Sequence, residues 1–231
     1  NSNLKYLLLF GDENLIPPIY NDEYPSDDFY STSLNNIFFG DPQLASGRIP
    51  VSSINDAISI AEKIKQYSLN PADGLWKSKI ALVADDFYKS CSYHTTEKSH
   101  TIYSNNIFNS LKDLLLVEPF YGIQYQLKQT NNGCEYPDLT NDLIRSINNG
   151  VSLINYIGHG APDSWSSEKI LNKTRDLPKI NVLDNKLAIW IAGTCSFGKY
   201  YGEDSFMEEL LIKKNGAIAV IATTDVIGYT E

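Results

Sequence analysis

The sequence predicts an α/β protein with an open, mostly parallel sheet flanked by helices and a smaller N-terminal α/β subdomain. From residue 79 onward, strands are predicted at 79–84, 121–128, 151–157, 187–192 and 216–222, and the runs at 151–157 and 187–192 are short and apolar and are each followed by a glycine. Such runs are typical of strands that are buried on both faces of a parallel sheet. Helical patterns separate them at about 95–115, 139–149 and 204–214, and this alternation implies right-handed crossovers between parallel strands.

The first 74 residues are predicted to form the smaller subdomain. Residues 4–10 are interpreted as a buried strand, and 41–50 as an edge strand. Ser53 or Asn55 can cap the helix that follows, in which apolar residues recur at helical spacing: Ile58, Ala61, Ile64 and Tyr67. The segment Asn70-Pro71-Ala72-Asp73-Gly74 ends this helix with a cluster of helix breakers. We therefore place a subdomain boundary at residue 74, with 75–231 as the second subdomain.

Acidic residues follow the first predicted strand. Asp12, Asp27 and Asp28 could share a structural calcium ion, because calcium binds carboxylate and carbonyl oxygens offered by flexible loops. Alternatively, they are solvated turn acids, with Ser26 capping a short turn. Arg48 is expected to be an internal ion-pair partner rather than a substrate contact.

The predicted helix at 139–149 places its apolar residues on one face, which would cover the sheet. These residues are Leu139, Leu143 and Ile147, and Gly150 follows at the usual position for a helix terminus.

Two predicted strands end in residues that can carry out chemistry. One precedes Gly158-His159-Gly160, and the other precedes Gly193-Thr194-Cys195. If these strands are neighbours, His159 and Cys195 meet at the sheet edge where ligands bind in open parallel sheets. An imidazole can take the thiol proton and leave a thiolate nucleophile. The amides of Gly160 and Cys195 could then donate to a developing oxyanion.

The motifs Tyr156-Ile-Gly158-His159-Gly160, Trp165 and Ala-Gly-Thr-Cys195 resemble the gingipain family of cysteine peptidases, which is peptidase family C25 of the caspase-like clan. Further motifs at 6–12, 26–30 and 47–51 extend the resemblance over nearly the whole chain, especially to the gingipain-like peptidases of type IX secretion systems. The resemblance implies a caspase-like sheet and a cysteine endopeptidase that acts through an acyl-enzyme. It assigns Cys195 as nucleophile and His159 as proton carrier. It also implies an extracellular or cell-surface location, and a family pattern that continues past residue 231.

In this resemblance, an acidic residue from the region after strand 79–84 orients the catalytic histidine. Glu97 is our candidate, and Asp85 and Asp86 are its competitors. Alternatively, Glu97 only favours the macrodipole of a helix N-terminus. His94 and His100 are six residues apart and do not share the helical face that zinc ligands use. We expect both histidines at the surface.

Three acidic residues lie just beyond predicted strand ends: Asp163, Asp225 and Glu231. A carboxylate in a partly desolvated pocket selects a cationic side chain, so Asp163 or Asp225 could favour a basic residue on the acyl side of the cut. The resemblance also suggests this preference, although surface turns and helix caps explain many such acids. Trp165 either forms a wall of the substrate cleft or packs over the core.

Composition restricts the partners. The chain has 28 acidic and 19 basic residues and a net charge of −9, which argues against nucleic acid and leaves a peptide or protein substrate. No apolar run approaches the roughly 20 residues needed to cross a bilayer, and no targeting segment is recognised. No cofactor is required by the predicted chemistry, and the oligomeric state is not predicted.

The chain has three cysteines. Cys91 and Cys134 could pair outside the cell and leave Cys195 as the free thiol, or they could be two ordinary thiols. Two other function classes stay open: a catalytically silent binding module with the peptidase fold, and a metal-dependent hydrolase built on Asp12, Asp85, Asp86 and His159.

Overall fold

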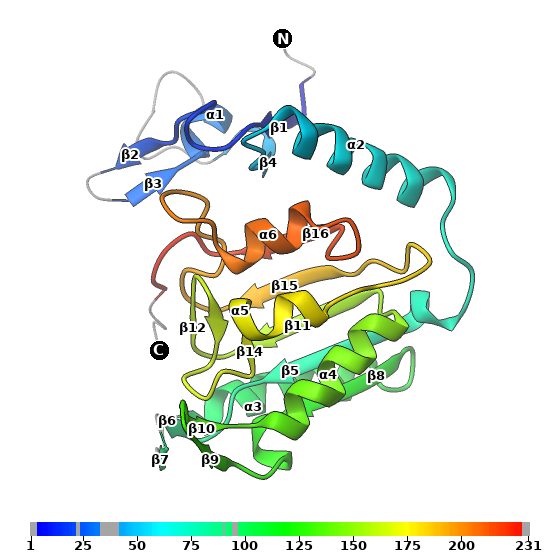
Figure 1. Ribbon diagram of the computed structural model, residues 1–231, viewed down its shortest axis with the longest axis vertical. Coiled ribbons are helices and arrows are strands. Elements are labelled where there is room, and N and C mark those ends of the chain that lie inside the picture. Colours follow the sequence, from blue (N-terminus) through cyan, green and yellow to red (C-terminus); the bar gives the residue numbers. More distant parts are fainter. Residues whose placement is uncertain (1–3, 22–23, 33–41, 90, 94–96, 228–231) are drawn as a thin grey trace.

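The computed structural model describes residues 4–21, 24–32, 42–89, 91–93 and 97–227 (Figure 1), so His94 and Glu231 lie outside the described residues. Five parallel strands form the central sheet, in the order β16-β15-β11-β5-β8. They are β5 (Lys79–Ala84), β8 (Leu116–Tyr121), β11 (Leu153–Ile157), β15 (Ile189–Gly193) and β16 (Ala219–Ala222). The predicted α/β class with a parallel sheet is confirmed.

Helices cover both faces of this sheet. Because successive residues of a strand point to opposite faces, β5 contributes to two cores. Ala81 and Val83 pack with α4 (Pro137–Asn149), whose buried residues include Leu139, Leu143 and Ile147, as predicted. Ile80 and Leu82 pack with α3 (Lys98–Leu111), through Ile107, Phe108 and Leu111. Figure 1 shows α4 in front of these strands.

Glycine ends α4 as predicted. Gly150 is the C-terminal cap and has a φ of 97°, which a residue with a Cβ rarely adopts. The predicted helix at 204–214 corresponds to α6 (Phe206–Ile212), which begins with a capping box formed by Ser205 and Glu208.

One predicted strand is wrong in position. The strand expected at 121–128 is β8 at Leu116–Tyr121, and Gly122–Gln124 form a short 3-10 helix, η3. Among the described strands, β8 pairs only with β5 and therefore lies at an edge of the sheet. An edge position tolerates a proline such as Pro119, which cannot donate to a ladder hydrogen bond.

Short elements complete the described chain. The hairpins are β2 (Ile19–Asn21) with β3 (Tyr24–Ser26), β6 (Tyr88–Lys89) with β7 (Ser92–Tyr93), and β9 (Lys128–Thr130) with β10 (Gly133–Glu135). A small sheet contains β12 (Gly160–Ala161), β13 (Ser164–Trp165) and β14 (Leu171–Asn172). The short helices are α1 (Asp28–Ser31), η1 (Leu75–Ser78), α5 (Lys173–Asp176) and η4 (Leu177–Lys179).

The N-terminal part contains a parallel pair of strands, β1 (Tyr6–Phe10) and β4 (Ala45–Ile49). The prediction of a buried first strand is wrong for most of its length. Leu9 is buried, whereas Tyr6, Leu8 and Phe10 are exposed. Tyr6, Leu8 and Phe10 alternate along β1 and therefore share one face of the strand, and their exposure shows that the described chain leaves this face uncovered.

Helix α2 (Ile54–Leu69) begins at Ser53, whose side chain accepts a hydrogen bond from the amide of Asp56. Of the apolar residues that recur at helical spacing in α2, Ile58, Ala61 and Ile64 are exposed, whereas Tyr67 is partly buried and packs against the main core. Ile60 and Lys63 are buried instead. The Nζ of Lys63 donates to the carbonyls of Leu211, Lys213 and Ala217, and these bonds turn this side of α2 toward α6.

The hydrogen bonds of Lys63 and a small hydrophobic core join the two predicted subdomains. Ile49, Val51 and Ile60 pack with Leu211 of α6. The elements of the large sheet begin after Gly74, but the division into subdomains stays a prediction. No described helix has both the length and the apolarity that a membrane span requires.

A disulfide links Cys91 and Cys134, with 5.4 Å between their Cα atoms. It connects the segment between β6 and β7 with strand β10. Of the two alternatives for these cysteines, the structure confirms pairing, and Cys195 is the free cysteine.

Candidate active site

His159 and Cys195 follow adjacent strands at the same edge of the sheet. β11 and β15 are parallel, with Ile157 opposite Gly193, so each residue lies two positions beyond the last pair. The two loops stay in contact past this point, since the amide of Gly158 donates to the carbonyl of Gly193 over 3.4 Å. The predicted neighbouring of the two strands is confirmed. The thiol of Cys195 is partly exposed and lies 3.6 Å from the carbonyl oxygen of Ile227.

Gly160 allows the two loops to approach each other closely. A Cβ at this position would lie 2.3 Å from Oγ1 of Thr194 and 3.2 Å from the carbonyl oxygen of Cys195. Ser196 has a left-handed φ of 54°, so the chain turns sharply after Cys195. Within the described chain, the amide of Cys195 donates to no protein acceptor.

The backbone of His159 is fixed by three hydrogen bonds. Its amide donates to Oδ2 of Asp85 over 3.0 Å. Its carbonyl accepts from the Tyr156 hydroxyl over 2.6 Å and from the Ser166 amide over 2.8 Å. Asp85 directly follows β5, the neighbour of β11. Contacts from two strands and the β13 segment therefore determine where the imidazole lies.

The ring of His159 faces Glu97. Its Nε2 lies 2.7 Å from Oε2 of Glu97, whose side chain is 14% exposed. Glu97 immediately precedes α3. The geometry favours Glu97 over its predicted competitors, because Asp85 binds the backbone of His159 rather than the ring. The catalytic role of Glu97 stays a prediction.

His100 is buried, so the prediction that it lies at the surface is wrong. Its ring is edge-on to that of His159, with centroids 5.1 Å apart, and its Nδ1 lies 3.8 Å from Glu97. Burial lowers the pKa of His100, and the neighbouring His159 acts in the same direction. His100 follows Glu97 by three residues, and residues three apart on a helix lie on the same side. This spacing could have indicated that Glu97 and His100 both face the site.

Trp165 does not line a substrate cleft. It is fully buried and stacks on Tyr156, with ring centroids 4.3 Å apart and an interplanar angle of 7°. Trp190 and Phe197 also contact it. Of the two alternatives for Trp165, the structure supports packing in the core, because β13 folds back toward the strand that carries Tyr156.

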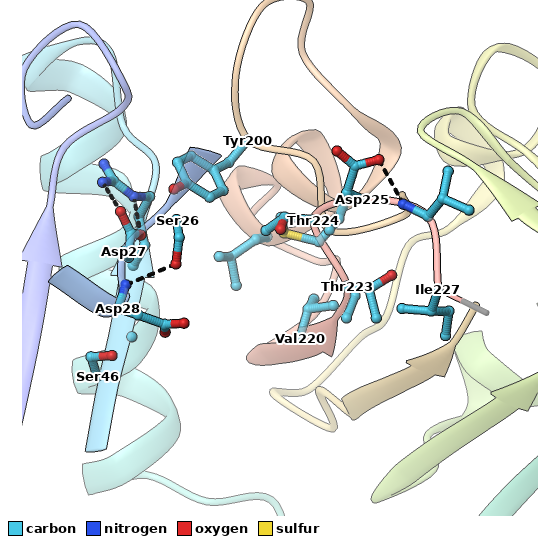
Figure 2. Close-up of a pocket in the computed structure, with 17 residues that line it drawn as sticks. Ser26, Asp27, Asp28, Ser46, Tyr200, Val220, Thr223, Thr224, Asp225 and Ile227 are labelled. Carbon is cyan, nitrogen blue, oxygen red and sulfur yellow. Dashed lines mark hydrogen bonds and ion pairs between the residues drawn. The ribbon is translucent and has the colours of Figure 1, made fainter. Parts of the chain in front are cut away.

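A pocket of about 680 Å³ lies beside the Cys195 loop, and Figure 2 shows the residues that line it. Asp225 and Ile227 line one side, and Asp27 and Asp28 line the other. A hydrogen bond connects the pocket to the loop that carries Cys195: the amide of Ser196 donates to the Asp225 carbonyl over 3.1 Å. The Asp225 carboxylate accepts from the Val226 amide over 2.6 Å and lies 3.5 Å from the Tyr201 hydroxyl.

Asp163, the other acid predicted to contact substrate, does not line this pocket. It is exposed in the turn between β12 and β13, where its carboxylate accepts from the Ser164 hydroxyl. The structure therefore favours Asp225 over Asp163 as a contact for a substrate side chain.

Of the three acids predicted to share a calcium ion, Asp12 and Asp27 use their carboxylates for contacts within the protein, and the calcium site stays a prediction. Arg48 contacts both carboxylate oxygens of Asp27, at 2.6 and 2.7 Å, as expected for an internal partner. Asp12 accepts from the amides of Asn14 and Leu15. The amide of Asp28 donates to Ser26, the predicted cap. The described part of the chain contains two clusters of side chains that could hold a metal ion. Neither of them includes Asp12, Asp27 or Asp28.

Comparisons with known proteins identify the family of this chain. Residues 1–231 match the family model for peptidase family C25. Gingipain R2 of Porphyromonas gingivalis is 25% identical over 232 residues, which cover 96% of this chain and 29% of gingipain R2. An uncharacterized protein of Archaeoglobus fulgidus is 23% identical over 250 residues, which cover 98% of this chain and 58% of that protein.

The fold is similar to that of a solved structure. The Arg specific cysteine proteinase gingipain R superposes with a TM-score of 0.78 at 22% identity, over 99% of this chain and 50% of that chain. This likeness shows a caspase-like α/β fold. The chain spans less than two thirds of the length of the relatives it matches.

Proposed function

This chain belongs to peptidase family C25, and from that premise we propose that it is a cysteine endopeptidase that cleaves peptide or protein substrates through an acyl-enzyme. The observation that carries the proposal is the pairing of His159 with Glu97 over 2.7 Å beside the strand end that bears the free Cys195. A carboxylate, an imidazole and a thiol in this order form the generalised triad of nucleophilic catalysis.

In the proposed reaction, each group has one task. Glu97 occupies Nε2 of His159, so Nδ1 is the ring nitrogen left to take the proton of Cys195. The thiolate attacks the scissile carbonyl carbon, and the Gly160 and Cys195 amides stabilise the resulting oxyanion. The imidazolium then protonates the departing amine as the C–N bond breaks. Water, deprotonated by His159, hydrolyses the thioester and restores the thiol.

We further propose that the enzyme prefers a basic residue on the acyl side of the cut. The pocket beside Ile227 contains three carboxylates, but Asp27 is already paired with Arg48. Asp225 has no cationic partner among the described residues. Its backbone is bonded to the residue after the nucleophile, so its carboxylate is the best placed to receive a cationic side chain.

The Cys91–Cys134 disulfide supports the proposal that the protein acts outside the cell or at its surface. Such bonds persist in oxidising compartments and are rare in the cytosol.

Two variants test the proposal, one at the nucleophile and one in the pocket. Cys195→Ala should abolish cleavage of a mixed peptide library while leaving the melting temperature unchanged, because the described chain holds no other free thiol. Unchanged turnover would end the cysteine-peptidase proposal. Retained binding of peptides without cleavage by the unmodified chain would favour the silent binding module.

For specificity, Asp225→Asn should reduce the preference for basic residues, and Asp163→Asn is the matched control outside the pocket. Cleavage mainly after apolar or acidic residues, or an unchanged preference in Asp225→Asn, would refute this part of the proposal.

A further inference from the structure

Behind His159 lies a cluster of three buried carboxylates that the proposed peptide cleavage does not use. Asp85, Asp86 and Glu168 have exposed fractions of 1%, 0% and 1%. Each offers one oxygen, and these oxygens lie within 4.8 Å of one another. Asp85 and Asp86 directly follow β5, and Glu168 lies between β13 and β14. The fold therefore brings together acids that are far apart in the sequence.

No described Lys or Arg residue forms an ion pair with this cluster. The ion pairs of the described Lys and Arg residues all involve other acids. Burying an uncompensated carboxylate costs several kcal/mol. The cluster must therefore take up protons or a cation.

Hydrogen bonds orient most of the oxygens but leave one without a donor. Asp85 accepts from the amides of Asp86 and His159. Asp86 accepts from the Tyr88 amide and the Tyr136 hydroxyl. One oxygen of Glu168 accepts from Ser166, whereas its Oε1 is buried and has no hydrogen-bond partner among the described residues. A buried oxygen without a hydrogen-bond donor lowers the stability of the fold unless another group or an ion binds it.

We propose that Asp85, Asp86 and Glu168 bind one calcium ion. Two ligands at about 2.4 Å from one calcium ion lie at most about 4.8 Å apart, and the oxygens of the cluster all lie within this limit. An all-oxygen set selects a hard cation, and a dry interior favours calcium over magnesium, which keeps several of its waters. Each carboxylate oxygen that accepts one hydrogen bond has a second lone pair for the ion.

The ion would also support the candidate active site, because Asp85 binds the amide of His159. The calcium proposal itself does not depend on the proposed peptidase activity. It can therefore be tested on the whole chain by binding and stability.

The first experiment measures calcium content by mass spectrometry and the melting temperature in EGTA or in calcium chloride. We expect one calcium ion in this cluster, and a rise in melting temperature of about 5 °C or more at free calcium about 100-fold above Kd. Glu168→Gln should abolish the rise. Absence of bound calcium, or an equal rise in Glu168→Gln, would overturn the proposal.

The matched control removes acids from another pocket, of about 470 Å³, which is lined by Asp56, Asp204 and other acidic residues. The double variant Asp56→Asn with Asp204→Asn should keep the calcium-dependent rise. Loss of the rise in this control would place the ion among these acids and would refute the cluster as its site.

Terbium binding to the unsubstituted chain covers the case in which Glu168→Gln fails to fold. Terbium in the cluster would lie next to Tyr136, whose hydroxyl binds Asp86, so tyrosine excitation should sensitise its emission. Because the site is buried, the emission lifetime should be nearly equal in H2O and D2O. A lifetime that shows several bound waters, or no sensitised emission, would contradict the proposal.

Discussion

Replacing Glu97 by Gln tests the proposed triad most directly, because it keeps the size of the side chain and removes its charge. The carboxylate lies 2.7 Å from Nε2 of His159, and a hydrogen bond to a charged group contributes about 1.5–3 kcal/mol. The His159 side chain is 37% exposed, so solvent weakens the interaction and we use about 1.5–2 kcal/mol. This corresponds to a loss of about 10- to 30-fold in kcat.

The loss should appear in kcat more than in KM, because the interaction strengthens when the imidazolium forms. Steady-state kinetics on a peptide substrate provide both values, and the melting temperature reports any loss of structure. Glu62→Gln, which removes a surface carboxylate paired with Lys65, is the control and should leave kcat unchanged. A loss in Glu97→Gln below about tenfold, or roughly 1.4 kcal/mol, would show that Glu97 is not the third member.

Two further predictions concern stability. Trp165→Ala should lower the free energy of unfolding by about 3–5 kcal/mol, because it leaves a cavity in a buried aromatic cluster. Urea unfolding measures this change, and a loss below about 1 kcal/mol would contradict the core position of Trp165. Burial lowers the pKa of Lys63 in the folded protein to about 8, from 10.5. Between pH 8 and pH 10.5 the unfolded chain therefore keeps the Lys63 proton that the folded protein has lost, so the free energy of unfolding should rise with pH in this range. Relative to Lys63→Met, the unsubstituted chain should gain on the order of 2 kcal/mol between pH 8 and pH 10, and equal pH dependence of the two proteins in urea unfolding would refute this reading.

The sequence alone predicted the strand–helix alternation and most of the sheet, because apolar runs of strand length and helical periodicity are local properties of the chain. It also predicted that His159 and Cys195 meet, since the ends of neighbouring parallel strands share one edge. Glycine on both sides of His159 marked the close approach of the loops. Glu97 needed the family resemblance, because 62 residues separate it from His159.

Only the tertiary structure decided which side chains are buried and what they contact. The structure places Trp165 in the core, one of its two predicted positions, and buries His100, which was expected at the surface. Their burial depends on how β13 and α3 pack, and the sequence pattern does not specify that packing. Lys63 is buried because carbonyls about 150 residues later in the chain accept its protons. In the same way, Glu168 joins Asp85 and Asp86 only after β13 has folded against the sheet. Such contacts depend on long-range packing, and local sequence carries no signal for them.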